Sequence, residues 1–324
     1  MTIKERMVKT NGINLHITEA GEGPLVLLLH GFPELAYSWR HQLPALAEAG
    51  FHAVAPDQRG YGQSDRPEPI DAYHMLNLVG DIVGLVDALG EEKAVIAGHD
   101  FGAMVTIHCA LLRPDMFHAV MLMSVPYSPR SWGNTSPIEG MKKMAGNNEF
   151  YIVYFQEPGK VEKELEANVR ETVTRTLYSL SGDALPEKRW RFLFNKGEKF
   201  TDTAYMPEVL PAWLTEEDID FFTQEFERTG YREAVNWYRN FDRNWELTPF
   251  LSGAKIHQPS LFIAGQEDSV VAMMGPAIDN QEKTMPNLRK KVLIPGAGHW
   301  VQQERPKEVN DLMIQFLKEI WSIS

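Results

Sequence analysis

The residues best placed to do chemistry lie in segment 95–103, which reads Val-Ile-Ala-Gly-His-Asp-Phe-Gly-Ala. A short β-prone run reaches a polar residue flanked by glycines, and a helix-compatible stretch follows. This is the strand-turn-helix pattern of the Gly-x-Ser-x-Gly motif, with Asp100 in place of the serine. A carboxylate is already ionised at neutral pH, so it can attack a saturated carbon and form an ester. The segment therefore predicts Asp100 as a nucleophile toward carbon; the alternative is an ordinary turn with an aspartate at a helix N-cap.

An ester on Asp100 needs a base to activate water and an acid to orient that base. The expected strand 260–264 is followed by Gly-Gln-Glu-Asp, and the expected strand 291–294 by Pro-Gly-Ala-Gly-His. Both polar groups follow the carboxyl end of a strand, in the order that Ser-Asp-His hydrolases use. His299 is therefore the predicted base and Asp268 the predicted acid, with Glu267 as the alternative acid.

The loop 30–34, His-Gly-Phe-Pro-Glu, follows the first clear strand, where a second donor to an oxyanion is expected. The backbone N–H groups of Phe32 and Phe101 would hold the charge that develops when water attacks the ester. A tight turn at Phe32-Pro33 is the alternative interpretation. Glu34 lies beside this loop, and the sequence leaves open whether it positions the water.

Strand and helix patterns alternate at both ends of the chain, which predicts an α/β fold with a mostly parallel sheet and helices on both faces. The expected strands are 25–29, 52–56, 94–97, 119–124, 260–264 and 291–294, and the clearest expected helices are 39–49, 76–89 and 307–320. From residue 126 to residue 245 the pattern is helical and aromatic, with no convincing buried strand. We therefore expect a core domain of 1–125 and 246–324 with an inserted helical cap domain, 126–245, over the carboxyl edge of the sheet.

Composition excludes several classes of function. The 324 residues include 32 Lys and Arg against 44 Asp and Glu, a net charge of −12, which disfavours nucleic acid and anionic membranes as partners. A single Cys rules out an intramolecular disulfide framework and a Cys-rich metal site. The N-terminus does not resemble a signal peptide. We expect a cytoplasmic protein that needs no cofactor or metal.

Several motifs resemble the soluble-type epoxide hydrolases of the α/β-hydrolase fold, over essentially the whole chain. They are His-Gly-Phe-Pro at 30–33, Gly-Tyr-Gly-Gln-Ser-Asp at 60–65, Gly-His-Asp-Phe-Gly at 98–102, and two cap segments, 150–159 and 236–240. The resemblance implies hydrolysis of an epoxide to a vicinal diol. It also places the family's two catalytic tyrosines at Tyr151 and Tyr238, which donate hydrogen bonds to the epoxide oxygen. That role suits a phenol, because a pKa near 10 keeps it protonated at neutral pH.

The expected partners are a small apolar epoxide and water. Four aromatic residues are expected to line the substrate pocket: Tyr154, Phe155, Trp237 and Trp300. A dehalogenase of the same fold is the first alternative, although such enzymes place Trp or Arg after the nucleophile, where this chain has Phe101. A catalytically silent binding protein is the second alternative. The sequence leaves the natural substrate and the oligomeric state open, and it is compatible with a homodimer.

Overall fold

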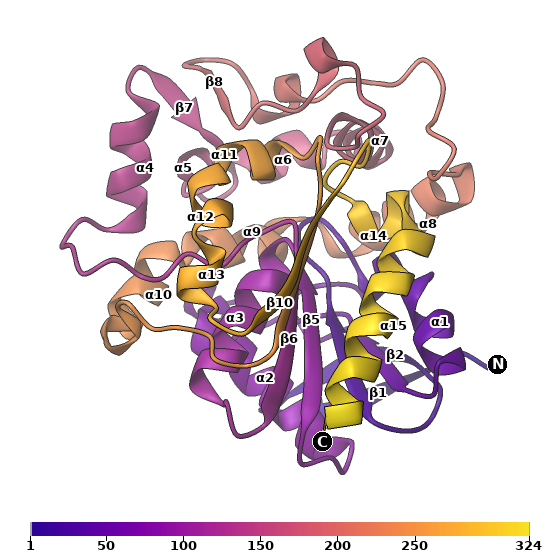
Figure 1. Cartoon of the computed structure of the whole chain (residues 1–324). Coiled ribbons are helices and arrows are strands. Elements are labelled where there is room, and N and C mark those ends of the chain that lie inside the picture. Colours follow the sequence, from indigo (N-terminus) through magenta and orange to yellow (C-terminus); the bar gives the residue numbers. More distant parts are fainter. Residues whose placement is uncertain (1, 324) are drawn as a thin grey trace.

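An eight-stranded sheet runs through the centre of the molecule, in the order β1-β2-β4-β3-β5-β6-β9-β10 (Figure 1). The structure is a computed structural model that describes residues 2–323. The first two strands pair antiparallel, β2 also pairs antiparallel with β4, and the remaining neighbours are parallel. The strands are β1 (Lys4–Thr10), β2 (Ile13–Ala20), β3 (Leu25–Leu29), β4 (His52–Pro56), β5 (Ala94–His99), β6 (Phe117–Met123), β9 (Ser260–Gly265) and β10 (Leu288–Ile294). The expected mostly parallel α/β-hydrolase sheet is confirmed.

Helices cover both faces of this sheet, so its central strands are buried on both sides. Helices α1 (Gln42–Glu48) and α15 (Pro306–Ile323) contact each other and share one apolar cluster with one face of the sheet. Helices α2 (Met75–Ala88) and α3 (Phe101–Leu112) contribute to the cluster on the other face. This explains why β3 is apolar at all of its positions, each of which is buried.

Between β6 and β9 the chain leaves the sheet and forms a largely helical layer, drawn above the sheet in Figure 1. We call residues 126–245 the inserted segment. Its regular elements are α4 (Pro137–Ala145), β7 (Asn148–Phe150), α5 (Tyr151–Tyr154), α6 (Lys160–Leu165), α7 (Val169–Ser179), β8 (Leu193–Asn195), α8 (Glu216–Thr229) and α9 (Arg232–Arg239), and α10 (Phe241–Leu247) crosses its end.

The inserted segment also contains the antiparallel pair β7–β8, where the sequence shows no convincing buried strand; each strand has only one buried residue. Each of these strands is only three residues long, too short for an alternating pattern to be visible in the sequence.

After β9 the chain forms α11 (Ser269–Met273), α12 (Gly275–Asp279) and α13 (Gln281–Thr284), and after β10 it forms α14 (Val301–Glu304). Among residues 2–323, no helix is both long enough and apolar enough to cross a membrane.

Candidate active site

Asp100 lies at the tip of the sharp turn between β5 and α3. Its backbone has a φ of +51° and a ψ of −122°, a conformation that non-glycine residues rarely adopt. The flanking glycines make the turn possible. A Cβ on Gly98 would lie 2.2 Å from the carbonyl oxygen of Gly102, and one on Gly102 would lie 2.2 Å from that of Leu29. The Gly-x-Asp-x-Gly spacing therefore presents the Asp100 carboxylate above the sheet edge.

The loops after β9 and β10 bring Asp268 and His299 to this carboxylate. The Nε2 atom of His299 lies 3.5 Å from Oδ2 of Asp100, and Nδ1 lies 3.2 Å from each carboxylate oxygen of Asp268. Asp268 is buried and caps α11, where it accepts a hydrogen bond of 2.8 Å from the N–H of Val270. The alternative acid, Glu267, instead pairs with Arg189 at 2.7 Å, and about a third of its side chain is exposed (32%). The geometry thus favours Asp268 over Glu267 as the partner of the base.

Ser124 joins this group, which the sequence analysis did not anticipate. It follows β6, between β5 and β9 in the sheet, and has a φ of +66°. Its hydroxyl donates to Oδ2 of Asp268 and lies 2.8 Å from Nδ1 of His299. Because its only hydrogen goes to Asp268, Ser124 can only accept from His299, so Nδ1 carries a hydrogen and Nε2 faces Asp100. A polar residue at the end of a central strand was the available signal.

The charges of this group shift its pKa values in opposite directions. Burial lowers the pKa of His299, but the negative charges and hydrogen bonds of Asp268 and Asp100 raise it well above its usual value. Burial raises the pKa of Asp100, but the hydrogen bond and charge of His299, with the Phe32 N–H, hold it below its usual value. This arrangement favours the protonated form of His299 in the free enzyme, an imidazolium between two carboxylates.

Removing the charge of Asp100 should lower the pKa of His299, because one of the two anions that hold its proton is lost. We expect this in an Asp100→Asn variant, measured by NMR titration of the His299 ring. Asp115→Asn, which changes an exposed aspartate beside Arg113, serves as the control and should leave that titration unchanged. An unchanged His299 titration in Asp100→Asn would contradict the assigned coupling.

Two backbone N–H groups lie at the nucleophile. The N–H of Phe32 donates to Oδ1 of Asp100 at 2.9 Å. Phe101 is the first residue of α3, where the N–H has no acceptor within the helix. Oδ1 is therefore the carboxylate oxygen already held by a donor, whereas Oδ2 faces His299.

Glu34 is buried behind this loop. One oxygen accepts from the Gly31 N–H at 2.9 Å and faces Nδ1 of His99, and the other accepts from Gln302 at 3.0 Å. Burial raises the pKa of Glu34, but the His99 ring and these hydrogen bonds hold it below its usual value. In turn, Nε2 of His99 contacts the carbonyl oxygen of His299 at 2.7 Å. Glu34 thus supports the Phe32 and His299 loops, and it is not among the residues that line the two cavities at Asp100.

Two cavities of unequal size meet at Asp100, Tyr151 and Tyr238. The larger has a volume of about 670 Å³ and an apolar lining that includes Met75, Met104, Met141, Met144, Met273 and Met274. The smaller has a volume of about 40 Å³, and its other lining residues include Leu165, Thr176, Leu180, Trp190, Phe200 and His299.

Tyr151 and Tyr238 lie with their rings 5.9 Å apart at this junction. In the described part of the chain, no group forms a hydrogen bond with either phenol hydroxyl. Burial, and next the charge of Asp100, raise the pKa of both phenols. Both side chains are therefore protonated donors at neutral pH with no protein acceptor.

The four aromatic residues expected to line the pocket line neither cavity. The Tyr154 hydroxyl donates to Glu164 at 2.6 Å, and Phe155 is buried with its ring against those of Tyr151 and Tyr238. The indole N–H groups of Trp237 and Trp300 donate to backbone carbonyl oxygens, at 3.0 and 2.9 Å. These side chains form the supporting layer behind the site, which corrects the sequence-based expectation.

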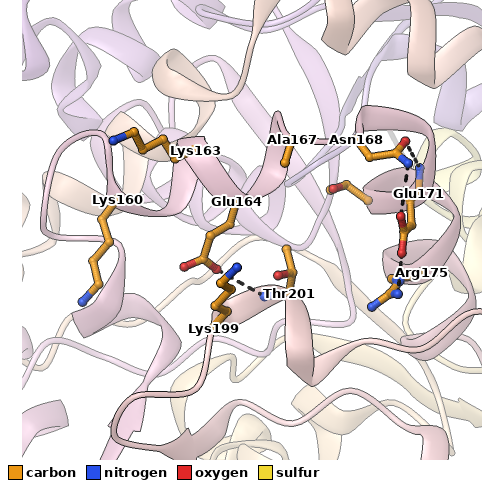
Figure 2. A pocket seen from close by; sticks show the side chains of 10 residues that line it. Lys160, Lys163, Glu164, Ala167, Asn168, Glu171, Arg175, Lys199 and Thr201 are labelled. Atoms are coloured by element: carbon orange, nitrogen blue, oxygen red, sulfur yellow. Dashed lines mark hydrogen bonds and ion pairs between the residues drawn. The ribbon is translucent and has the colours of Figure 1, made fainter.

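A third hollow, of about 410 Å³, lies on the inserted segment between α6 and α7 (Figure 2). Charged side chains line it, among them Lys160, Lys163 and Lys199. The carboxylate of Glu164 accepts from the N–H of Thr201, and that of Glu171 accepts from the Asn168 side chain and pairs with Arg175. It shares Thr172 with the smaller cavity but contains none of the candidate catalytic residues. Within residues 2–323, no cluster of His, Cys, Asp and Glu could hold a metal ion.

Comparison with known proteins gives consistent matches. The profile of a family described as the alpha/beta hydrolase fold matches residues 24–306. Epoxide hydrolase A of Mycobacterium tuberculosis is 48% identical over 97% of both chains, and epoxide hydrolase 1 of Siraitia grosvenorii is 40% identical over 98% of this chain and 99% of its own. The solved structure of an epoxide hydrolase from an endophytic Streptomyces superposes with a TM-score of 0.95 at 48% identity, covering 99% of this chain and 96% of its own.

Proposed function

The chain belongs to the epoxide hydrolases of the α/β-hydrolase fold family, and from this premise we propose that it forms a covalent ester on Asp100 and then hydrolyses it. The observation that carries the proposal is the junction of the two cavities. There one carboxylate, one imidazolium and two phenols without protein acceptors face the same space. We further propose that residues 126–245 act as a cap domain, since they supply both phenols.

In the first step, Oδ2 of Asp100 bonds to one epoxide carbon and the bond from that carbon to the ring oxygen breaks. Oδ2 is the attacking atom because Oδ1 is already held by the Phe32 N–H. The leaving oxygen takes a proton from Tyr151 or Tyr238, and the proton of His299 replaces it on the phenol. Both phenols stabilise the developing alkoxide, which is where a preorganised donor has its greatest effect.

In the second step, His299 is a neutral base because its proton has passed to the phenol. The ester also removes the charge of Asp100, one of the two carboxylates that raise the pKa of His299, the other being Asp268. It takes a proton from water, whose oxygen attacks the ester carbonyl carbon. The N–H groups of Phe32 and Phe101 hold the negative charge on Oδ1. Collapse of this intermediate releases the diol; one proton of the water ends on the diol and the other on His299.

The shape of the site supports an apolar, unequally substituted epoxide as substrate. The cavity of about 670 Å³ accommodates a bulky apolar substituent, whereas the cavity of about 40 Å³ accommodates a small one. Methionine side chains adapt to differently shaped apolar groups, so their number in the larger cavity favours tolerance of several substituents.

No observation favours a dehalogenase. Phe101 offers no side-chain donor to a departing halide. The indole that packs on Phe101, that of Trp237, donates its N–H to the carbonyl oxygen of Arg59.

A single turnover in ¹⁸O-labelled water, with enzyme in excess over styrene oxide, tests the mechanism. The diol should leave with an oxygen that began on Asp100, because water attacks the ester carbonyl and not the substrate carbon. We therefore expect unlabelled diol and ¹⁸O in the peptide that contains Asp100, both read by mass spectrometry. Label that appears in the diol at once would indicate direct attack by water and would refute the covalent ester.

A further inference from the structure

The loop that carries His299 is attached to the inserted segment just after α7. The backbone N–H of His299 donates to the carbonyl oxygen of Leu180 at 2.8 Å, and the indole N–H of Trp300 donates to that of Leu177 at 2.9 Å. Leu180 also lines the smaller cavity, beside His299. One short stretch of the inserted segment therefore contacts both the base and the space beside it.

Glu304, in α14, holds the two sides of this contact together. One of its carboxylate oxygens accepts from the N–H of Gly182 at 2.9 Å and from that of Gly298 at 2.8 Å, and the other accepts from the N–H of Trp300 at 3.0 Å. Two of these donors flank His299, and the third belongs to the inserted segment. The Glu304 side chain thus joins the inserted segment to the His299 loop.

The backbones pack closely on both sides of the His299 loop. A Cβ on Gly182 would lie 2.4 Å from the carbonyl oxygen of Gly296, and one on Gly298 would lie 2.3 Å from the nitrogen of Gly182. On the opposite side, a Cβ on Gly265 would lie 2.1 Å from the carbonyl oxygen of Gly298. The His299 loop is therefore held between the end of β9 and the inserted segment, so a shift of Gly182 must move it.

The burial of the Glu304 carboxylate is energetically unfavourable. Glu304 is buried, and within residues 2–323 no Lys, Arg or His forms an ion pair with its carboxylate. Burial raises its pKa to about 7, against the lowering effect of the three N–H donors. A buried carboxylate without a cation costs free energy unless its hydrogen bonds compensate. An apolar side chain would be sufficient for packing at this position. The advantage of Glu304 is therefore that its carboxylate fixes three backbone N–H groups.

We propose that Glu304 is a positioning residue for ester hydrolysis: it holds residues 180–182 against the His299 loop, so that Nε2 stays aligned on the water that attacks the Asp100 ester. Glu304 does not touch the substrate and acts only through His299. This inference rests on the proposed function, because it assigns Glu304 to the second half-reaction. The first half-reaction needs no base, so it should be insensitive to Glu304.

Glu304→Gln, studied by rapid mixing and chemical quench with mass detection of the ester, separates the half-reactions. We expect alkylation of Asp100 at close to the normal rate and hydrolysis slower by roughly 10-fold, since small misplacements of a catalytic group have effects of this order or larger. The ester should accumulate, and kcat and KM should fall together while kcat/KM is retained. Glu166→Gln is the matched control: this glutamate also accepts from a backbone N–H, that of Tyr231, and should change neither rate.

Gly182→Ala provides a second variant that leaves Glu304 intact and forces the inserted segment away from the loop, and it should give the same signature. Normal hydrolysis rates in both variants would overturn the proposal. Equal decreases in the rates of alkylation and hydrolysis, with a lower kcat/KM, would also overturn the proposal, because a merely structural role of Glu304 predicts that result. An absence of any ester in a His299→Gln variant would instead refute the proposed mechanism itself, so the two failures are distinguishable.

Discussion

Replacing His299 with glutamine is expected to stop the reaction halfway, with the substrate covalently attached to Asp100. The carboxylate needs no base to attack, and both phenols keep the proton that the leaving oxygen takes, so the ring can still open once although His299 no longer returns a proton to the phenol. Hydrolysis, in contrast, loses the group that deprotonates water, a loss of about 10²- to 10⁴-fold for general-base catalysis. Intact mass spectrometry after mixing with styrene oxide should show a protein heavier by one substrate, and peptide mapping should place the addition on Asp100.

The control for this experiment is a double variant, Asp100→Ala with His299→Gln, which should gain no mass because the attacking oxygen is absent. Folding of both proteins is checked by circular dichroism. A folded His299→Gln protein that is inactive and unmodified would contradict the assignment, because it would mean that His299 is needed for ring opening as well.

The positions of the candidate catalytic groups along the fold could be predicted because they follow from strand ends. Asp100 and Asp268 each come just after a buried strand, and His299 follows β10, the last strand of the sheet, in which only Ile294 is buried. The carboxyl ends of parallel strands meet at one edge of the sheet. Ser124 follows the same rule, yet it was missed because a serine at a strand end is common, and only the fold shows that β6 lies between β5 and β9.

Which aromatic side chains face the cavity could not be predicted from the sequence. Tyr151 and Tyr154 share the single-turn helix α5, yet one borders both cavities and the other donates to Glu164 outside them. A helix of one turn has no periodicity from which a buried face could be assigned. Its orientation depends on β7 and β8, two short strands that pair across a long separation in the sequence. Glu304 was missed for a related reason, since its three backbone partners come from two separate parts of the chain.

Tyr151→Phe and Tyr238→Phe should each slow ring opening by roughly 10- to 1000-fold, the range for removal of one transition-state donor. The change keeps the ring and its aromatic contacts but removes the hydroxyl that we propose binds the epoxide oxygen. The rate of Asp100 alkylation in a single turnover is the relevant measurement, since steady-state rates also contain hydrolysis. Burial and the charge of Asp100 raise the pKa of both phenols, so neither phenol loses its proton in the neutral range. The phenols should therefore cause no change in the alkylation rate with pH across that range.

Tyr154→Phe is the matched control for this pair, because Tyr154 belongs to the same helix as Tyr151 and donates its hydroxyl to Glu164 away from both cavities. It should alkylate at the normal rate. If the two phenols bind the same oxygen, the double variant should lose more than either single variant, because the alkoxide then forms without any side-chain donor. Single variants that both alkylate at the normal rate would show that the epoxide oxygen is protonated by another group, even if the ester on Asp100 still forms.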